Sequence, residues 1–474
     1  MHFKSTRTIS DKNIICRLHV RKSLEKISFT GLNKFFSECE SSSILGANPS
    51  ITSSGRFSYW ASEPKEIFEL RSGQKNPFEK LQKILNKYKL SQDNTAALPD
   101  GIFCGGWIGF FSYELGGYIE KLPVTTTDDL KMPLIRLCFY DRVIAYDHIE
   151  NSFILFALEM RGDTETPEQK LTKLEQIILK SHDIKMSPPA HSEIDDIDFS
   201  KIPCNMSREY YMRAFEKIKK YIYDGDVYQI NFSRRFESEF HSEAIKLFNW
   251  QNLYNPSPYS AYIDTGEFKI VSASPEMFIT VNNGIISTKP IKGTRPRLRY
   301  SDKNYAIELL DNEKEQAELN MIIDLERNDI AKICIPGTRK VTQPRTIETF
   351  PTVFHAVAEI AGQLREEITF CDIIKSMFPG GSITGAPKIR SMEIIDETEP
   401  TARGVYTGSI GFIGINGNIS LNIAIRTIII KNNKAYFQTG GGIVADSEPE
   451  AEWQETIVKA KALLAGIKIL NEPQ

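Results

Sequence analysis

The sequence predicts a two-lobed α/β protein of the α+β kind, in which antiparallel β-sheets from both halves pack as a sandwich and helices lie outside. Strand-like runs occur in both halves and are interleaved with separate helices, as in mixed proteins built on antiparallel sheets. The strands are not spaced as regular βαβ units, which argues against a Rossmann-like parallel sheet. At 474 residues the chain is long for a single core.

A connector is predicted at residues 186–203, because this stretch is acidic, contains proline and is poorly patterned. It separates an N-terminal region, residues 1–185, from a C-terminal region, residues 204–470, that carries the candidate site. We expect the two regions to form one unit, with the connector crossing the surface rather than marking a boundary between independent domains.

The elements are predicted from periodicity and end signals. The N-terminal region contains strand-like runs at residues 56–61, 105–113, 142–147 and 153–158 and an amphipathic helix at 77–88. After the connector, a helix is predicted over residues 208–223, with Ser207 as its N-cap and Gly225 just past its end. Further strands are predicted at 227–236, 259–264 and 267–279, and helices at 301–328, broken near Asn312, and at 368–377.

The composition describes an ordinary globular protein, with 41% hydrophobic and 25% charged residues. A net charge of −3 argues against nucleic-acid binding. The seven cysteines include no Cys-x-x-Cys pair, so we predict neither a disulfide framework nor a zinc ribbon and expect a reducing cytoplasm. No apolar run approaches about 18 residues, and the N-terminus lacks a secretory signal, so no membrane span is expected.

Residues 290–297, Pro-Ile-Lys-Gly-Thr-Arg-Pro-Arg, form the first candidate site. They follow two strand-like runs, so Lys292 is predicted to lie on a rigid turn at the end of a β-hairpin. If Arg295 and Arg297 are close in space, like-charge repulsion would favour the neutral, nucleophilic amine. An ordinary exposed lysine in a basic loop is the commoner case, and the segment alone leaves both interpretations open.

Two pairs of glutamates are candidate metal ligands. Helical spacing places Glu315 and Glu318 on one stripe with Ile322 and Leu325, which are expected to enter the core. Buried carboxylates need a cation or a pocket. Solvated helix faces are the commoner explanation of such a pattern.

A second helix near the C-terminus repeats the arrangement. Ser447 and Glu450 form a predicted capping box. Glu452 and Glu455 are not explained by capping, and they share a face with Lys459. Two Glu-x-x-Glu pairs could supply hard oxygen ligands to Mg²⁺, although a solvated face is again the alternative.

Two glycine-rich stretches, residues 378–388 and 438–444, are too dense in glycine for connectors alone. Small residues expose backbone N–H groups that can bind an anion. Neither stretch matches a nucleotide-binding motif, so the anion is expected to be a carboxylate. Tight hairpin turns explain the glycines equally well.

Taken together, the second half closely resembles the chorismate-utilising enzymes, the family that contains anthranilate synthase component I and aminodeoxychorismate synthase component I. The matching blocks follow the family's order and lie at residues 225–229, 233–236, 274–276, 290–297, 324–330, 378–388, 406–411, 424–427, 440–444 and 452–459. The N-terminal half matches more loosely, at residues 105–109 and 113–115. The resemblance implies an anthranilate synthase component I-like fold and chorismate as the substrate.

The resemblance also implies a Mg²⁺ cofactor. Glu318 and Glu455 fall on the family's Mg²⁺ ligands, with Glu315 and Glu452 as supporting or water-mediated positions. The metal would hold the ring carboxylate of chorismate and polarise the ring toward loss of its 4-hydroxyl.

The enolpyruvyl carboxylate of chorismate is expected to meet an arginine and backbone donors, which suit a carboxylate. The positions that match this part of the family's site are Tyr406, Arg426, Gly440, Gly441 and Gly442.

Four further residues match positions of the substrate site. His355 corresponds to a family histidine that assists the departing hydroxyl. We expect His355 to lie in an apolar helix, where a lone histidine is usually structural. The other implied substrate-binding residues are Gln229, Thr294 and Lys459.

Two positions distinguish among the family's reactions. Relatives that add water to chorismate carry a lysine base where this chain has Gln229, which disfavours isochorismate or salicylate chemistry. Around Lys292 this chain has Pro-Ile-Lys-Gly-Thr, which resembles the segment found in aminodeoxychorismate synthases. The corresponding segment of anthranilate synthases resembles Pro-Ile-Ala-Gly-Thr. The implied mechanism is attack of Lys292 on ring carbon C2 with loss of the 4-hydroxyl, followed by entry of ammonia at C4 and release of the lysine. The product would be 4-amino-4-deoxychorismate, which leads to 4-aminobenzoate and folate.

The sequence contains no Gly-x-Cys-x-Gly-type glutaminase turn. We therefore expect ammonia to come from solution or from a separate glutamine amidotransferase subunit. One alternative is anthranilate synthase component I, which shares every block except the lysine. An alternative of another class is a non-catalytic protein that binds chorismate or an aromatic amino acid; retention of all four glutamates together with His355 and Lys292 argues against it.

Overall fold

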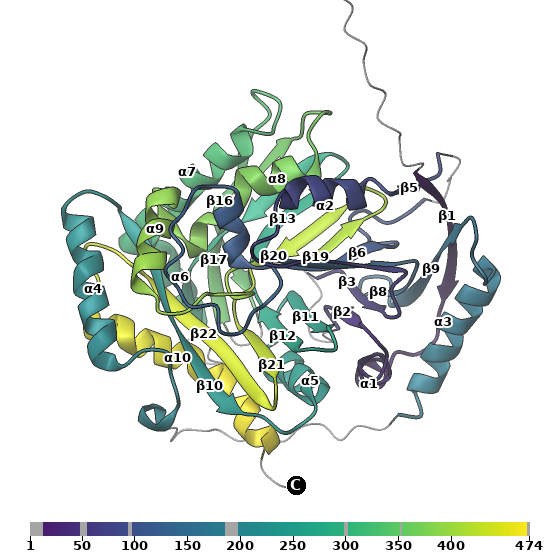
Figure 1. Cartoon of the computed structure of the whole chain (residues 1–474), viewed down its shortest axis with the longest axis horizontal. Coiled ribbons are helices and arrows are strands. Elements are labelled where there is room, and N and C mark those ends of the chain that lie inside the picture. Colours follow the sequence, from purple (N-terminus) through teal and green to yellow (C-terminus); the bar gives the residue numbers. More distant parts are fainter. Residues whose placement is uncertain are drawn as a thin grey trace, which may run out of the picture.

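The computed structural model describes residues 13–47, 55–92, 97–184, 198–297, 302–350 and 353–471. Within these residues the chain forms two large β-sheets that face each other, with helices outside them (Figure 1). Every pair of named strands in this part of the chain is antiparallel except β1 with β5. The predicted mixed fold on antiparallel sheets is thereby confirmed.

The first sheet has twelve strands among the described residues. Their order is β18 (Gly385–Ala386), β10 (Gln229–Glu239), β22 (Lys434–Ile443), β21 (Thr427–Lys431), β12 (Lys269–Ser274), β11 (Tyr259–Asp264), β2 (Ser43–Leu45), β3 (Phe57–Ala61), β8 (Arg142–Asp147), β9 (Ser152–Met160), β1 (Ile14–Ser23) and β5 (Tyr88–Leu90).

The second sheet has ten strands in the same described ranges. Their order is β15 (Ile291–Pro296), β17 (Val353–Gln363), β14 (Ile285–Lys289), β13 (Met277–Asn282), β20 (Ile419–Asn422), β19 (Ser409–Gly414), β6 (Gly106–Phe111), β7 (Ile135–Tyr140) and β4 (Glu66–Leu70), with β16 (Lys340–Thr349) also paired to β17.

Both sheets combine strands from the two predicted regions. In the first sheet β11 pairs with β2, and in the second β19 pairs with β6. The main hydrophobic core contains buried side chains of both sheets and both regions. Most of the predicted connector, residues 186–197, lies outside the described residues. The regions on either side of it share their sheets and core, as expected for one unit.

The helices cover the outer faces of the sandwich (Figure 1). On the first sheet they are α1 (Phe29–Ser37), α3 (Pro167–Ser181), α5 (Ala244–Tyr254) and α10 (Pro449–Asn471), with α4 (Arg208–Tyr223) and α9 (Lys388–Thr398) near β10. On the second sheet they are α2 (Pro77–Leu85), α6 (Asp302–Asp311), α7 (Glu313–Ala331) and α8 (Phe370–Met377). No helix in the described ranges is long and apolar enough to cross a membrane.

Several predicted helix ends are confirmed. The helix α4 has the predicted bounds, and the Ser207 hydroxyl accepts a hydrogen bond from the N–H of Tyr210 at 3.2 Å. The break near Asn312 separates α6 from α7, because the Asn312 side chain caps α7 by accepting from the N–H of Glu315 at 2.9 Å.

The strand predicted over residues 267–279 is instead two strands, β12 and β13, which belong to different sheets. Pro275 lies between them, and proline has no N–H with which to continue a ladder. The chain therefore crosses from one sheet to the other at this point, and Glu276 lies at the crossing.

Candidate active site

Lys292 lies on β15 and not on a hairpin turn, so that prediction was wrong. The strands β14 and β15 both pair with β17, and Pro290, which cannot donate a backbone hydrogen bond, lies between them. The register with β17 shifts between Ile291 and Thr294, and Gly293 in this bulge has φ of +92°, a conformation that favours glycine. A bulged strand, rather than a turn, therefore positions the lysine.

The amine of Lys292 faces three carboxylates and a second amine. Glu318, Glu276 and Glu455 favour its charged form, and Lys459 opposes it. Although the residue retains some exposure, desolvation of the amine has the largest effect and lowers the pKa of Lys292 below its ordinary value. Among the described residues none forms a hydrogen bond or ion pair with this amine. We call these five residues the lysine cluster.

The arginines expected to act on Lys292 are engaged elsewhere. Arg295 forms ion pairs with Glu308 at 3.0 Å and Glu315 at 2.8 Å, and Arg297 donates to a backbone carbonyl at 3.3 Å. Neither arginine is among the main influences on the pKa of Lys292. The predicted cause was wrong, because two carboxylates balance the charge of Arg295.

Glu276 is a member of the cluster that sequence reasoning did not single out. It is 4% exposed, and the Ser382 hydroxyl donates to its Oε1 at 2.6 Å. Burial raises the pKa of Glu276 above its ordinary value, while the hydrogen bond from Ser382 and the charge of Lys292 oppose the rise. The sequence signal that could have identified Glu276 is a carboxylate directly after proline within an apolar run. Ser382 comes from the glycine-rich stretch 378–388, which forms the short helix η3 (Gly381–Ile383) and β18 rather than a hairpin turn.

Glu315 and Glu318 lie half-buried in the first two turns of α7. No described group donates to Oε2 of Glu315. A methyl group at Gly293 would lie 2.9 Å from this oxygen, so glycine permits the carboxylate to approach β15. Glu318 is thus a member of the lysine cluster, and Glu315 borders it.

Glu452 and Glu455 approach from the first turns of α10. The Ser447 hydroxyl donates to Glu452 at 2.7 Å, whereas Glu450 accepts from Gln454 at 3.0 Å. The predicted capping box of Ser447 with Glu450 was wrong, because the serine orients Glu452 instead. Glu455 forms an ion pair with Lys459 at 2.6 Å.

The four glutamates come from two helices, and one from each helix, Glu318 and Glu455, faces Lys292. Within the described ranges, no group of three or more histidine, cysteine or acidic side chains is close enough together to hold a metal ion. The donors themselves are hard carboxylate oxygens, the type that Mg²⁺ prefers, and one of them is an unpaired buried oxygen. The chemistry of the donor set thus fits Mg²⁺.

The second glycine-rich stretch lies in β22, not in a turn. Gly440 in this stretch lies opposite Ser233 on β10, and the N–H of Ser233 donates to Glu399 instead of to β22. In antiparallel pairing, Gly440 therefore directs its own backbone groups away from β10, and Lys459 donates to its carbonyl at 2.9 Å. Gly442, two residues along, has the same orientation. The stretch offers backbone N–H groups on the side where α10 approaches.

Gln229 is fully buried on β10, and neither of its amide atoms has a hydrogen-bond partner among the described residues. A methyl group at Gly442 would overlap its Nε2. An unpaired buried amide is costly, so it marks a position where ligand atoms would complete the hydrogen bonds.

His355 lies on the strand β17 rather than in a helix, and it is 2% exposed. Its Nδ1 shares a hydrogen bond with Oγ1 of Thr294 at 2.9 Å, while no described group bonds to its Nε2. Burial, aided by the charge of Arg426, lowers the pKa of His355 to about 3, so the ring is neutral at ordinary pH.

Arg426 and Tyr406 complete the surroundings. Burial lowers the pKa of Arg426, and no hydrogen bond to its guanidinium is formed within the part of the chain that is described. Tyr406 is buried near Ser233, the residue opposite Gly440. An unpaired guanidinium suits a carboxylate ligand.

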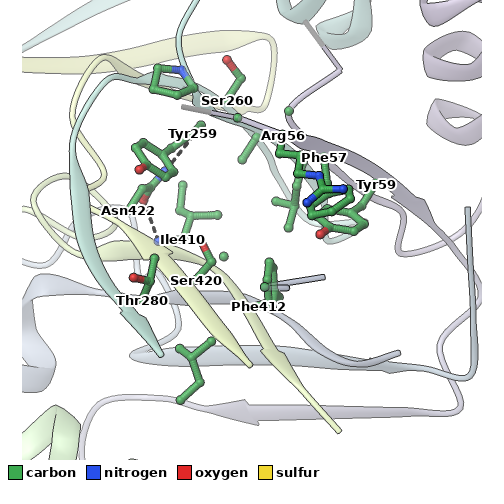
Figure 2. A pocket seen from close by; sticks show the side chains of 18 of the residues that line it. Arg56, Phe57, Tyr59, Tyr259, Ser260, Thr280, Ile410, Phe412, Ser420 and Asn422 are labelled. Atoms are coloured by element: carbon green, nitrogen blue, oxygen red, sulfur yellow. Dashed lines mark hydrogen bonds between the residues drawn. The ribbon is translucent and has the colours of Figure 1, made fainter. Parts of the chain in front are cut away.

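A separate cavity of about 250 Å³ lies between the two sheets (Figure 2). Tyr59, Tyr259 and Phe412 line it, and the side chain of Asn422 bridges Ile410 and Tyr259 through hydrogen bonds of 2.9 and 3.0 Å. It shares no lining residue with the lysine cluster. The groups suited to chemistry therefore lie elsewhere.

The lysine cluster and its neighbours combine an amine, a buried carboxylic acid, several carboxylates and an unpaired guanidinium. An amine of lowered pKa can attack carbon, and a carboxyl of raised pKa can donate a proton. The arrangement suits a small substrate that carries carboxylates and a leaving group.

Comparison with known proteins identifies the family. The model for the chorismate binding enzymes matches residues 48–465. Aminodeoxychorismate synthase component 1 of Bacillus subtilis is 38% identical over 385 residues, covering 81% of each chain. Anthranilate synthase component 1 of Acetivibrio thermocellus is 38% identical over 444 residues, covering 91% of this chain and 87% of its own. The crystal structure of anthranilate synthase component I from Streptococcus pneumoniae is 33% identical and matches with a TM-score of 0.72, covering 86% of this chain and 92% of its own. The chain therefore belongs to the chorismate-binding enzymes, of the type represented by the anthranilate and aminodeoxychorismate synthases.

Proposed function

We propose that the protein is the chorismate-converting component of an aminodeoxychorismate synthase, which forms 4-amino-4-deoxychorismate from chorismate and ammonia. The observation that carries this proposal is Lys292, a partly desolvated amine of lowered pKa that faces the buried carboxyl of Glu276. An enzyme that adds ammonia directly to the ring has no need of a nucleophilic lysine at this point.

The first step needs a neutral amine and an acid. A single proton transfer from the Lys292 ammonium to the Glu276 carboxylate produces both. The amine then forms a bond to C2 of the ring as the ring double bond shifts and the C4–O bond breaks. Glu276 protonates the departing hydroxyl, which leaves as water. Glu276 suits this role better than His355, because the pKa of His355 is about 3 and its neutral ring is a poor acid.

In the second step ammonia forms a bond to C4, the double bond returns, and the C2–N bond to Lys292 breaks. The lysine leaves as a neutral amine, and the new C4 ammonium can return a proton to Glu276. Gln229, fully buried and without partners in the described structure, would contribute amide hydrogen bonds to a ligand and carries no charge with which to activate water.

Magnesium is part of the proposal. Glu318 and Glu455 would hold the ion, with Glu315 and Glu452 supporting it, and the ion would neutralise the ring carboxylate and favour loss of the hydroxyl. Arg426 and the N–H groups of β22 would bind the enolpyruvyl carboxylate.

The proposed partner is a glutamine amidotransferase subunit that supplies ammonia. The relatives named above are each component 1 of a synthase, and this accords with a second component here. We expect conversion of chorismate with ammonium salts alone, and with glutamine only when the second subunit is added. Glutamine-dependent turnover by the isolated chain would contradict this part of the proposal.

Identification of the product tests the whole proposal. The purified chain, Mg²⁺, chorismate and an ammonium salt should yield 4-amino-4-deoxychorismate, detected by mass and by conversion to 4-aminobenzoate with an added lyase. Anthranilate as the main product would instead identify anthranilate synthase component I, whose relatives match this chain equally well. Binding of chorismate without conversion would indicate a non-catalytic protein.

A further inference from the structure

Arg234 is a buried arginine without an acidic partner. It lies on β10, on the same face of the strand as Phe232 and Phe236, and is 3% exposed. No carboxylate forms an ion pair with it within the described part of the chain. Burial lowers the pKa of Arg234 below its ordinary value. An apolar side chain would occupy this position at a lower desolvation cost, so the arginine is expected to serve a purpose that an apolar residue cannot.

The guanidinium of Arg234 holds the beginning of α10. Its carbon Cζ lies 3.4 Å from the centre of the Trp453 ring, and its Nε donates to Oγ1 of Thr456 at 2.8 Å. Thr456 in turn donates to the carbonyl of Trp453 at 2.7 Å, and Thr439 on β22 donates to the carbonyl of Thr456 at 2.9 Å. A planar guanidinium can stack on a ring and donate in its own plane at the same time. The arginine therefore contacts α10 at two residues that lie on one face of the helix.

These two residues lie beside the glutamates of the candidate site. Trp453 directly follows Glu452, and Thr456 directly follows Glu455. Successive helix residues are rotated by about 100° around the axis, so each pair, at spacing i and i+3, forms a stripe next to the other. A rotation of α10 that moved Trp453 and Thr456 relative to β10 would turn both carboxylates by the same angle.

We propose that Arg234 is a positioning residue that sets the rotation of α10 and thereby aims Glu452 and Glu455 at Mg²⁺. The inference rests on the proposed function, in which these two glutamates hold or support the ion. Arg234 acts only through the carboxylates, because a cation has no attraction for Mg²⁺.

Positioning and charge have opposite consequences when Arg234 is replaced. By electrostatics alone, removal of a positive charge close to Glu452 and Glu455 would strengthen the binding of a divalent cation. Loss of the contacts with Trp453 and Thr456 would instead let the carboxylates turn away and weaken that binding. The sign of the change in Mg²⁺ affinity therefore distinguishes the two roles.

Calorimetric titration of the purified protein with Mg²⁺, in the absence of chorismate, measures this sign without turnover. Arg234→Met keeps a side chain of similar length and removes the guanidinium. Arg234→Lys keeps the charge but not the planar group that stacks on Trp453. We expect the dissociation constant for Mg²⁺ to rise about tenfold in both variants, the lower end of the effect of residues that orient metal ligands. At saturating Mg²⁺, kcat should be close to that of the unmodified enzyme, because the reacting groups are intact.

Arg235→Met is the matched control. Arg235 is the next residue of β10, so its side chain lies on the other face of the strand, where it forms an ion pair with Asp129. This variant should bind Mg²⁺ as the unmodified protein does. The melting temperature of each variant without Mg²⁺ shows that it is folded.

Thr456→Val tests the same contact from the side of α10. It removes the hydroxyl that accepts from Arg234 and keeps the shape of the side chain, so it should also weaken Mg²⁺ binding. Its combination with Arg234→Met should bind Mg²⁺ little more weakly than Arg234→Met alone, since both changes break one contact.

The outcomes separate this inference from the proposed function. Unchanged or tighter Mg²⁺ binding in Arg234→Met and Arg234→Lys, next to normal binding in the unmodified protein, would overturn the inference and leave the proposed function intact. If Arg234→Met did not fold, unchanged binding in Thr456→Val would have the same consequence. If the unmodified protein bound no Mg²⁺, the metal site of the proposed function would fail, and this inference with it.

Discussion

The two sides of the site differ in how their charged groups meet water. On the side of α7 and the crossing between the sheets, Glu276 is 4% exposed. On the side of β22 and α10, the side chains of Glu455 and Lys459 are 49% and 47% exposed and form an ion pair. Residues 440–442 of β22 are glycines, so the polar groups that they contribute are those of the backbone.

This difference separates chemistry from binding. Burial shifts the balance between charged and neutral forms, so the α7 side can hold an acid and a reactive amine near neutral pH. The exposed charges of the α10 side can attract an anionic substrate and a divalent cation. We therefore expect substitutions on the first side to reduce kcat and substitutions on the second to weaken binding.

The largest effect is expected from Lys292→Ala. Formation of 4-amino-4-deoxychorismate should fall by at least about 10³-fold, because loss of a covalent nucleophile removes the first step entirely. Ring carbon C2 would be open to ammonia, so a trace of the 2-amino isomer is expected. Lys292→Arg should not restore activity, since guanidinium stays protonated and is a poor nucleophile. Product analysis by mass and by lyase coupling measures both outcomes.

Lys289→Ala provides the matched control for this experiment. Lys289 lies on the neighbouring strand β14 and forms an ion pair with Glu348, which is not a member of the lysine cluster. This variant should keep nearly full activity. Equal activity of Lys292→Ala and the unmodified protein would show that the lysine is not a nucleophile.

Replacement of the two proposed metal ligands tests whether the sides cooperate. Glu318→Gln and Glu455→Gln preserve shape but remove a charge that a hard cation needs. Each should reduce Mg²⁺-dependent activity by at least about 100-fold, the upper end of the effect of supporting residues. Calorimetric titration with Mg²⁺ should show weaker binding in both variants.

Two exposed positions on the same helices serve as controls for the metal experiment. Asp324→Asn on α7 and Glu450→Gln on α10 remove charges that pair with Arg327 and Arg208 at the surface. Both should bind Mg²⁺ as the unmodified protein does. If only one of Glu318→Gln and Glu455→Gln weakened Mg²⁺ binding, the metal would be held from one side of the site alone.

The sequence predicts the fold well because most of its helices and strands have local signals. The helix α4, its cap at Ser207 and the break at Asn312 follow from periodicity and capping residues. The errors occur where tertiary structure decides the outcome. Lys292 was predicted on a turn, and His355 in a helix, because the pairing of β15 and β17 over a long separation leaves no local pattern.

The candidate site shows the same limit. The glutamate pairs and glycines are visible as motifs, and the family resemblance assigns them roles. The cause of the lowered pKa of Lys292 is not visible, because burial and the approach of Lys459 depend on packing between distant segments. Glu276 lies within a block that matches the family, but only its place beside the lysine in the structure indicates a role for it.

A smaller effect is expected from Gly442→Ala on the binding side. The added methyl group would overlap the Gln229 amide and displace it or β22. We expect KM for chorismate to rise about tenfold, equivalent to about 1.4 kcal/mol, with a smaller change in kcat. Steady-state kinetics measures both. A fall in kcat at constant KM would instead place this glycine on the chemical side of the site.

The smallest effect concerns His355, a buried group on the chemical side that we expect to stay neutral. Its pKa in the folded protein is about 3, below the ordinary histidine value of about 6.5. The unfolded chain therefore binds a proton more readily than the folded one between these two values, and this histidine's contribution to stability, complete above about pH 6.5, is lost as pH falls. Between pH 7 and pH 5 the expected loss of unfolding free energy from this residue is about 2 kcal/mol.

His355→Gln should remove that loss, because glutamine does not titrate and can still hydrogen-bond to Thr294. Urea denaturation at pH 7 and pH 5 measures the difference. His241, whose side chain is 65% exposed, provides the control, and His241→Gln should lose as much stability on acidification as the unmodified protein. If His355→Gln also lost as much stability as the unmodified protein between pH 7 and pH 5, the imidazole would be protonated in the folded protein at pH 5. It would then be available as the acid for the departing hydroxyl, and Glu276 would lose its advantage for that role.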